Sequence, residues 1–331
     1  HYQWGSAGQI DYLSQANRII TDGIKPSETD VNGTKRTLLG DWSIGQYSRW
    51  GTRSSDWMTG HFQAYHAATG DAYWLDASAV VYSTIASLQA GYSPVTGLMP
   101  DFVVGEPPRP ANPGHLEGDT DDDFSWNACR FPWRIAMDYM HYGSPEAKAA
   151  LTSIVAWLKG ATGGNPSQIR AGYTLSGSPL AVYSSAAFTA PMIAACTIDT
   201  AHQSYLDAGW DLLLNNKYDY YGDTINLLCM LAVTGNWWKP DSAAPTSAPT
   251  AAPTTHSGVT GDVNGNGMTD IVDALLVAQY YVGLDPSGFV YANADTNCNG
   301  NVDIVDALLI AQYYVGLINQ FCQVNKRSCS L

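Results

Sequence analysis

Residues 261–284 read GDVNGNGMTDIVDALLVAQYYVGL, and residues 294–317 repeat them as ADTNCNGNVDIVDALLIAQYYVGL. The two copies align without gaps at an offset of 33 residues, so one structural unit occurs twice. The segment 261–317 contains seven Asp and no Glu, Lys or Arg, and this concentration of negative charge requires a counterion. The repeat therefore predicts a small domain of two equivalent halves that bind cations.

Each copy has the spacing of an EF-hand calcium loop, in which oxygen ligands stand at positions 1, 3, 5, 7, 9 and 12. Gly267 and Gly300 stand at position 6, where the loop must turn sharply. Asp replaces the usual Glu at position 12, and a helix follows each loop without a clear helix before it. The predicted ligands of two Ca²⁺ ions, with Met268 contributing its carbonyl, are Asp262, Asn264, Asn266, Met268, Asp270, Asp273, Asp295, Asn297, Asn299, Asn301, Asp303 and Asp306.

In these features residues 261–320 resemble the type I dockerins of cellulosomal enzymes. The resemblance implies folding coupled to Ca²⁺ binding and a cohesin domain of a scaffoldin as the partner. It also implies partner contacts at loop positions 10 and 11, which are here the apolar pairs Ile271-Val272 and Ile304-Val305. Because the copies match, we expect either face to bind. The alternative is a solvated acidic turn without metal.

Residues 239–260 separate this domain from the rest of the chain. They consist mainly of Pro, Ser, Thr and Ala, with little apolar bulk to bury. A Pro-rich spacer of this length spans up to about 60 Å, so we expect two independent modules. The sequence thus predicts domains at 1–238 and 261–320, joined by a linker.

Composition narrows the possible functions of the 331 residues. Acidic residues outnumber basic ones 30 to 16, and no Lys/Arg cluster offers a surface for nucleic acid. No stretch approaches 18 consecutive apolar residues, so no membrane partner is expected. The six Cys lack the CxxC spacing of zinc sites, and Cys298 has Cys322 or Cys329 as a possible disulfide partner.

The first 238 residues show the apolar spacing of successive helices. Several expected helices end in Gly followed by a capping residue, as at Gly70-Asp71 and Gly143-Ser144. This pattern predicts an all-α toroid of antiparallel helix pairs. The expected helices are 9–22, 54–68, 72–90, 127–142, 145–160, 180–197, 200–216 and 219–234.

Four segments, at 52–71, 126–143, 163–175 and 225–240, resemble glycoside hydrolase family 8, in its branch of lichenases, cellulases and chitosanases. The sequence NACRFPWRI in the second segment is the most specific of these features. The resemblance implies an inverting endo-glycosidase on an (α/α)6 barrel, of whose twelve helices about eight are expected here. Together with the dockerin, it implies a secreted enzyme of an extracellular cellulosome.

Inversion requires a general acid and a general base, and the resemblance implies where the base lies. Many family members carry an Asp base where this chain has Asn127, and an amide cannot accept a proton. The branch takes its base from a loop just upstream, in which Glu117 is our choice. Arg130 is expected to hold that carboxylate ionised or, alternatively, to pair with Asp138 in the core. The other carboxylates of the loop, expected to be mostly solvated, are Glu106, Asp119, Asp121, Asp122 and Asp123.

The family keeps its general acid upstream of a signature whose last four residues resemble residues 1–4, His-Tyr-Gln-Trp. We therefore expect that the chain begins after the acid and lacks the proton donor by itself. Asp56 is an alternative acid, although substrate binding is its more natural role. The expected substrate-binding residues are Asp56, Trp57, Trp126, Asn127 and Tyr221.

These features predict a cellulosomal endo-β-1,4-glucanase that acts on cellulose or mixed-linkage β-glucan. A chitosanase is the nearest alternative, because an acidic cleft attracts a cationic polymer. A chain that binds glucan without cleaving it is the alternative outside catalysis.

Overall fold

The computed structural model describes residues 1–2, 5–8, 10–240 and 260–322. Two compact units divide the chain, His1–Pro245 and Thr246–Leu331. Most of the predicted linker, together with Gln3, Trp4 and Cys329, lies outside the described residues. None of the described helices is both long and apolar enough to cross a membrane.

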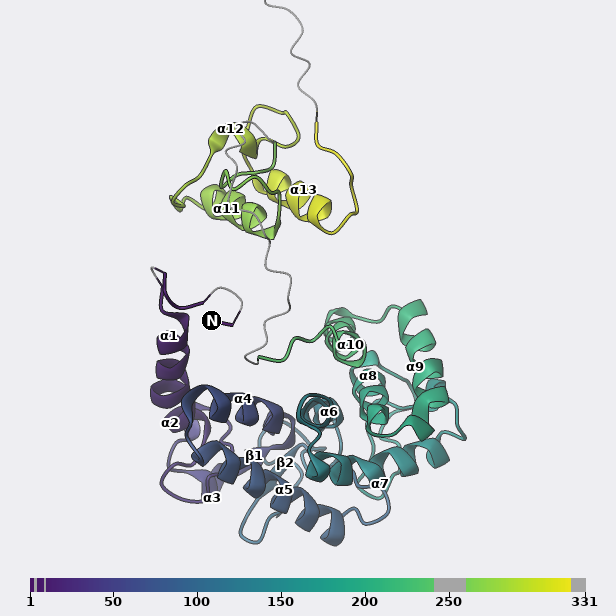
Figure 1. Ribbon diagram of the computed structural model, residues 1–331. Coiled ribbons are helices and arrows are strands. Elements are labelled where there is room, and N and C mark those ends of the chain that lie inside the picture. The colour runs from purple at the N-terminus through teal and green to yellow at the C-terminus, as the bar shows by residue number, and fades with distance from the viewer. Residues whose placement is uncertain (3–4, 9, 241–259, 323–331) are drawn as a thin grey trace, which may run out of the picture. The chain divides into compact units, whose positions relative to one another are not determined.

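The large unit is a curved row of helix pairs (Figure 1). Helices α4, α6, α8 and α10 pack in sequence against one another, while α5, α7 and α9 each pack on the helix before them. This alternation confirms the predicted all-α architecture of the (α/α) barrel type. The helices are α1 (Tyr12–Arg18), α2 (Lys25–Glu28), α3 (Tyr47–Trp50), α4 (Thr59–Thr69), α5 (Tyr73–Gly91), α6 (Phe131–Tyr142), α7 (Pro145–Ala161), α8 (Ala186–Ala195), α9 (Gln203–Asn215) and α10 (Tyr220–Val233), with a π-helical segment at Ile19–Ile24.

The helix boundaries follow the punctuation of the sequence. Helix α6 ends at Gly143, whose φ of +67° is the left-handed conformation that glycine adopts without strain. Ser144 then caps α7 by accepting the backbone N–H of Ala147. Gly70 ends α4 in the same way, with a φ of +71°.

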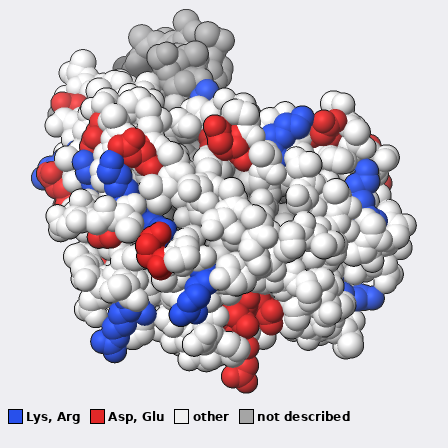
Figure 2. Space-filling view, turned by 90° about the horizontal axis from the view of Figure 1, so that it is seen from below, with Lys and Arg blue, Asp and Glu red and all other residues white. Residues whose placement is uncertain are grey.

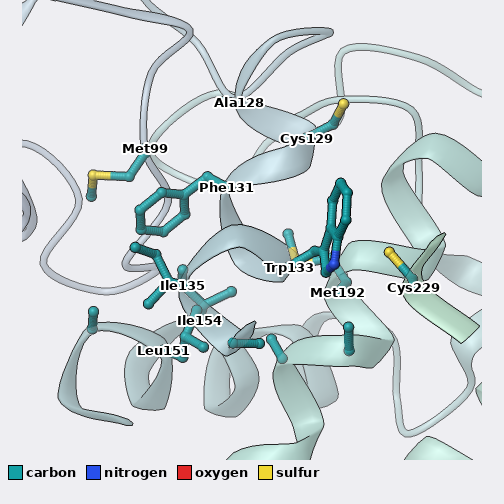
Figure 3. Packing of buried hydrophobic residues seen from close by; sticks show 14 of the residues in the cluster. Met99, Ala128, Cys129, Phe131, Trp133, Ile135, Leu151, Ile154, Met192 and Cys229 are labelled. Carbon is teal, nitrogen blue, oxygen red and sulfur yellow. The ribbon is translucent and has the colours of Figure 1, made fainter. Parts of the chain in front are cut away.

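The core of the large unit is built from the apolar stripes of α6, α7 and α8 (Figure 3). Phe131, Trp133 and Ile135 of α6 lie above Leu151 and Ile154 of α7, and all five are buried. Every residue of α8 is buried, as expected for a helix enclosed by its neighbours.

A short antiparallel sheet, absent from the predicted architecture, crosses the large unit. It consists of β1 (Thr52–Arg53), β2 (Phe102–Val104) and β3 (Arg109–Pro110), in the order β1-β2-β3. Arg53 pairs with Phe102, so the sheet brings together segments that are about fifty residues apart. Strands this short depend on the tertiary packing around them rather than on local propensity.

The small unit contains α11 (Ile271–Tyr281), α12 (Tyr291–Ala294) and α13 (Ile304–Tyr314). Helices α11 and α13 pack on each other and begin with the same capping box, formed by Asp270 with Asp273 and by Asp303 with Asp306. A disulfide joins Cys298 to Cys322, with the Cα atoms 5.9 Å apart. The two repeated segments thus fold as equivalent halves.

The charges of the surface are dispersed. On the face shown in Figure 2, Lys and Arg side chains lie singly or beside Asp and Glu, and they form no continuous basic patch.

Candidate active site

The loop that carries Glu117 is held from inside by a buried carboxylate. Asp121, only 2% exposed, accepts the backbone N–H groups of Leu116 (2.7 Å), Glu117 (3.0 Å) and Gly118 (3.0 Å). We expected the carboxylates of this loop to be mostly solvated, and for Asp121 that expectation was wrong. Three donors in a buried site bind a carboxylate more strongly than water does.

Both carboxylate oxygens of Glu117 have protein donors. Arg53 of β1 donates from Nη2 to Oε1 at 3.1 Å, and Asn127 donates from Nδ2 to Oε2 at 2.8 Å. The side chain of Glu117 remains 48% exposed, so solvent reaches it. These contacts fix the orientation of a carboxylate that is open to a substrate or a water molecule.

Arg130 acts on this carboxylate through Asn127. Its Nη2 donates to Asn127 Oδ1 at 3.1 Å, which turns the amide nitrogen toward Glu117. Among the described residues, the guanidinium paired with Glu117 is that of Arg53, which the sequence analysis missed. The alternative ion pair of Arg130 with Asp138 is not formed, because Asp138 accepts the hydroxyl of Tyr82.

The same network reaches Asp56. Arg130 Nη2 donates to Ser55 Oγ at 3.0 Å, and Ser55 Oγ donates to Asp56 Oδ1 at 2.9 Å. Asp56 and Glu117, 61 residues apart in sequence, therefore belong to one hydrogen-bonded chain. This juxtaposition is what a site that handles a polar polymer requires.

Asp101, which the sequence analysis did not single out, anchors the network from below. It directly precedes β2, is 3% exposed, and its Oδ1 accepts the backbone N–H groups of Ser125 (3.0 Å), Asn127 (3.1 Å) and Ala128 (2.6 Å). Burial raises the pKa of the Asp101 carboxyl to about 7, against the opposing effect of these donors. Asp101 thereby holds the turn from which Asn127 projects.

Aromatic residues border the network on one side. Trp126 is 40% exposed and packs edge-on against Phe188, with 4.9 Å between ring centroids. Tyr221 donates its hydroxyl to the Trp126 carbonyl at 3.2 Å and accepts from Arg130 Nη1 at 3.0 Å. Trp126 and Tyr221 are thus placed to contact a substrate held at Glu117.

Trp57 does not fit the role of a sugar platform that we expected for it. The side chain is 1% exposed, packs against Phe131, and donates from Nε1 to Thr52 Oγ1 at 3.0 Å. No face of the indole is open to a ligand, so Trp57 belongs to the core beneath the site.

The two repeat loops are shaped as calcium loops. In the first, Asp262 and Asn264 both accept the backbone N–H of Asn266, so their oxygens converge on one side of the turn. Asp273 is fully buried and accepts the N–H groups of three loop residues, which closes the loop onto α11. The second loop repeats these contacts from Asp295, Asn297 and Asp306.

These donors fit a hard cation such as Ca²⁺, because they are oxygens of carboxylates, amides and the main chain. The described residues bring together no metal-binding group of three His, Cys, Asp or Glu side chains. A calcium site here therefore depends on the Asn and carbonyl oxygens as well as on Asp, and the predicted ligand set remains a prediction.

The pairs predicted to contact cohesin are open to solvent in both halves. Ile271 and Val272 are 50% and 45% exposed, and Ile304 and Val305 are 48% and 47% exposed. Apolar β-branched side chains at the start of each helix thus remain uncovered to the same extent in both copies.

Comparisons with known proteins agree with this geometry. Residues 1–235 match glycosyl hydrolases family 8, and residues 260–314 match the dockerin type I domain. An endoglucanase of Bacillus sp. (strain KSM-330) is 44% identical over 241 residues, which cover 72% of this chain and 51% of that protein. A beta-glucanase of Niallia circulans is 41% identical over 240 residues, covering 71% of this chain and 58% of that protein.

A solved structure shows the same fold. The apo structure of a beta-1,3-1,4-glucanase from Paenibacillus sp. X4 superposes with a TM-score of 0.68 at 38% identity, covering 72% of this chain and 63% of that one. The chain thus spans between half and two thirds of the length of these relatives. On this evidence the chain belongs to glycosyl hydrolases family 8, with a type I dockerin domain following its family 8 part.

Proposed function

We propose that residues 1–238 act as an inverting endo-β-1,4-glucanase on cellulose or mixed-linkage β-glucan, with Glu117 as the general base. The observation that carries the proposal is the pair of donors, Arg53 and Asn127, that orient a solvent-exposed carboxylate. The activities printed for the relatives, endoglucanase, beta-glucanase and beta-1,3-1,4-glucanase, support the substrate class.

The geometry suits activation of a water molecule. A carboxylate accepts about four hydrogen bonds, so each oxygen of Glu117 keeps a free lone pair after binding its protein donor. The positive charge of Arg53 favours the negative form that a base must have. In inversion, this base takes a proton from the water that attacks the sugar on the face opposite the leaving group.

Asn127 occupies the place of the family's Asp base but has a different task. Its amide oxygen accepts from Arg130 and its amide nitrogen donates to Glu117, so it transmits the position of the guanidinium to the base. Arg130 is in turn a positioning residue. Asp56, Trp126 and Tyr221 lie on the same network and are proposed to bind the glucan, Asp56 through sugar hydroxyls and the rings through sugar faces.

The small unit is proposed to attach the enzyme to a cohesin domain of a scaffoldin in an extracellular cellulosome. Two Ca²⁺ ions, one in each loop, would hold the carboxylates and amides together and couple binding to folding. The two exposed apolar pairs are proposed as alternative cohesin contacts, since each half presents the same face.

The test is reducing-sugar release from barley β-glucan, carboxymethylcellulose and chitosan, measured on this chain and on the full product of its gene. We expect release from the two glucans and none from chitosan, with the new reducing end first appearing as the α-anomer by proton NMR. Release from chitosan alone would replace the glucanase by a chitosanase. Binding without release by either protein would leave a glucan-binding chain.

A further inference from the structure

A pair of tryptophans stands beside the loop of Glu117. Trp42 lies in a 3-10 turn, Asp41–Ser43, and Trp50 ends α3. Their ring centroids are 5.5 Å apart at an interplanar angle of 70°, the edge-to-face arrangement that aromatic pairs prefer. Trp42 is 51% exposed, so its ring is held by its neighbour while part of its surface faces solvent.

This pair is joined to the candidate active site by two contacts between the same two segments. His115 bonds through Nε2 to the Trp50 carbonyl at 3.0 Å, and Arg53 bonds to Glu117 at 3.1 Å. His115 precedes Glu117 by two residues, a chain distance of at most about 7 Å. The surface of Trp42 and Trp50 therefore continues directly into the site.

The core does not account for the exposure of Trp42. The buried cluster beneath this region consists of Leu39, Phe102, Val104 and Ala111, against which Trp50 packs. Trp42 contributes no buried surface to that cluster. A large aromatic ring held rigidly at the surface is a feature of ligand-binding grooves rather than of stability.

The surroundings of the two rings favour a sugar polymer as the ligand. The exposed Arg49 places its guanidinium carbon 4.3 Å from the Trp50 ring centroid, so hydrogen-bond donors lie beside an apolar face. A β-linked pyranose has the matching chemistry, with C–H groups on its faces and hydroxyls around its rim. A protein partner would require a much larger contact area than two rings provide.

We propose that Trp42, with Trp50 and Arg49, forms a further subsite for the outer part of a β-glucan chain bound at Glu117. This inference rests on the proposed function, from which it takes the polymer. Trp42 would bind sugars remote from the cleaved bond, so it should affect long substrates and leave short ones unchanged.

The test is calorimetric titration of the chain with cellotriose and with cellohexaose. We expect Trp42→Ala to weaken binding of cellohexaose by about tenfold, the magnitude of one aromatic contact, and to leave cellotriose unaffected. Trp42→Tyr should restore most of the affinity. Trp238→Ala is the matched control, because Trp238 is 44% exposed and belongs to neither aromatic group near Glu117.

The outcomes separate this subsite from the glucanase itself. Unchanged hexaose binding by Trp42→Ala, with both ligands weakened by Trp126→Ala, would overturn the subsite and leave the proposed function standing. Equal weakening of both ligands by Trp42→Ala would also overturn a remote subsite. If the unmodified chain binds neither oligosaccharide, both proposals fail.

Discussion

Asp121 is the residue whose removal tests most sharply how the loop of Glu117 is held. In Asp121→Ala, the N–H groups of Leu116, Glu117 and Gly118 lose a charged acceptor, and the loop loses its internal anchor. A bond to a charged group contributes about 1.5–3 kcal/mol when its partner stays buried. Here the loop is partly exposed, so water can replace part of the loss.

We therefore expect a destabilisation of about 2–3 kcal/mol, which lowers the Tm of the large unit by roughly 4–10 °C. Activity on barley β-glucan should fall by more than the stability loss explains, because the carboxylate of Glu117 would no longer be fixed. The assay pairs thermal unfolding with initial rates at a temperature where both proteins are folded.

Asp119→Ala is the control, since it removes the same charge from an exposed position of the same loop. Asp121→Asn should lie between the two, because an amide oxygen can accept some of the N–H groups while its NH₂ faces the others. If Asp121→Ala melts and reacts like Asp119→Ala, the buried carboxylate does not position Glu117 and the reasoning is refuted.

Three further predictions concern pH, calcium and the partner. Burial raises the pKa of Asp101 to about 7 in the folded chain, so this chain keeps a proton that the unfolded chain releases near pH 4. Stability should therefore fall as pH rises from about 4 to about 7, and Asp101→Asn should flatten that slope in denaturant titrations; an unchanged slope would contradict it. Removing Ca²⁺ with EDTA should unfold residues 261–320 alone, seen by NMR as the loss of their dispersed amide signals, whereas signals that persist without Ca²⁺ would exclude the coupling. Replacing Ile271 and Val272 by Asp should weaken cohesin binding only about twofold, since Ile304 and Val305 offer a second face, while replacing both pairs should weaken it more than a hundredfold. Loss of binding on replacing one pair would show in a pull-down or calorimetry that the faces are not equivalent.

Local pattern was sufficient for the helices. The 3.6-residue spacing and the Gly-Ser step at Gly143 and Ser144 predicted α6 and α7 to within a few residues, because capping and amphipathicity are local properties. The short sheet could not be predicted in this way. Its strands have two or three residues each and are stabilised by partners about fifty residues away.

The candidate site was predictable only in part, for the same reason. Glu117 and Asn127 were accessible from a family pattern, whereas Arg53 and Asp101 reach the network through contacts between distant segments. Residue type alone also misled us for Trp57, because an aromatic side chain suits a core and a sugar platform equally well. A lone Asp before the apolar run Phe-Val-Val was the one sequence signal that could have pointed to Asp101 as a buried anchor.

The central claim is that Glu117 is the base of a β-glucan hydrolase. The most direct measurement is the initial rate of reducing-sugar release from barley β-glucan by Glu117→Gln, with Asp119→Asn as the matched control and the full gene product as the enzyme. The account predicts a rate at least about a hundredfold below the unmodified protein for Glu117→Gln, and an unchanged rate for Asp119→Asn. A Glu117→Gln variant that hydrolyses β-glucan as fast as its control would contradict it.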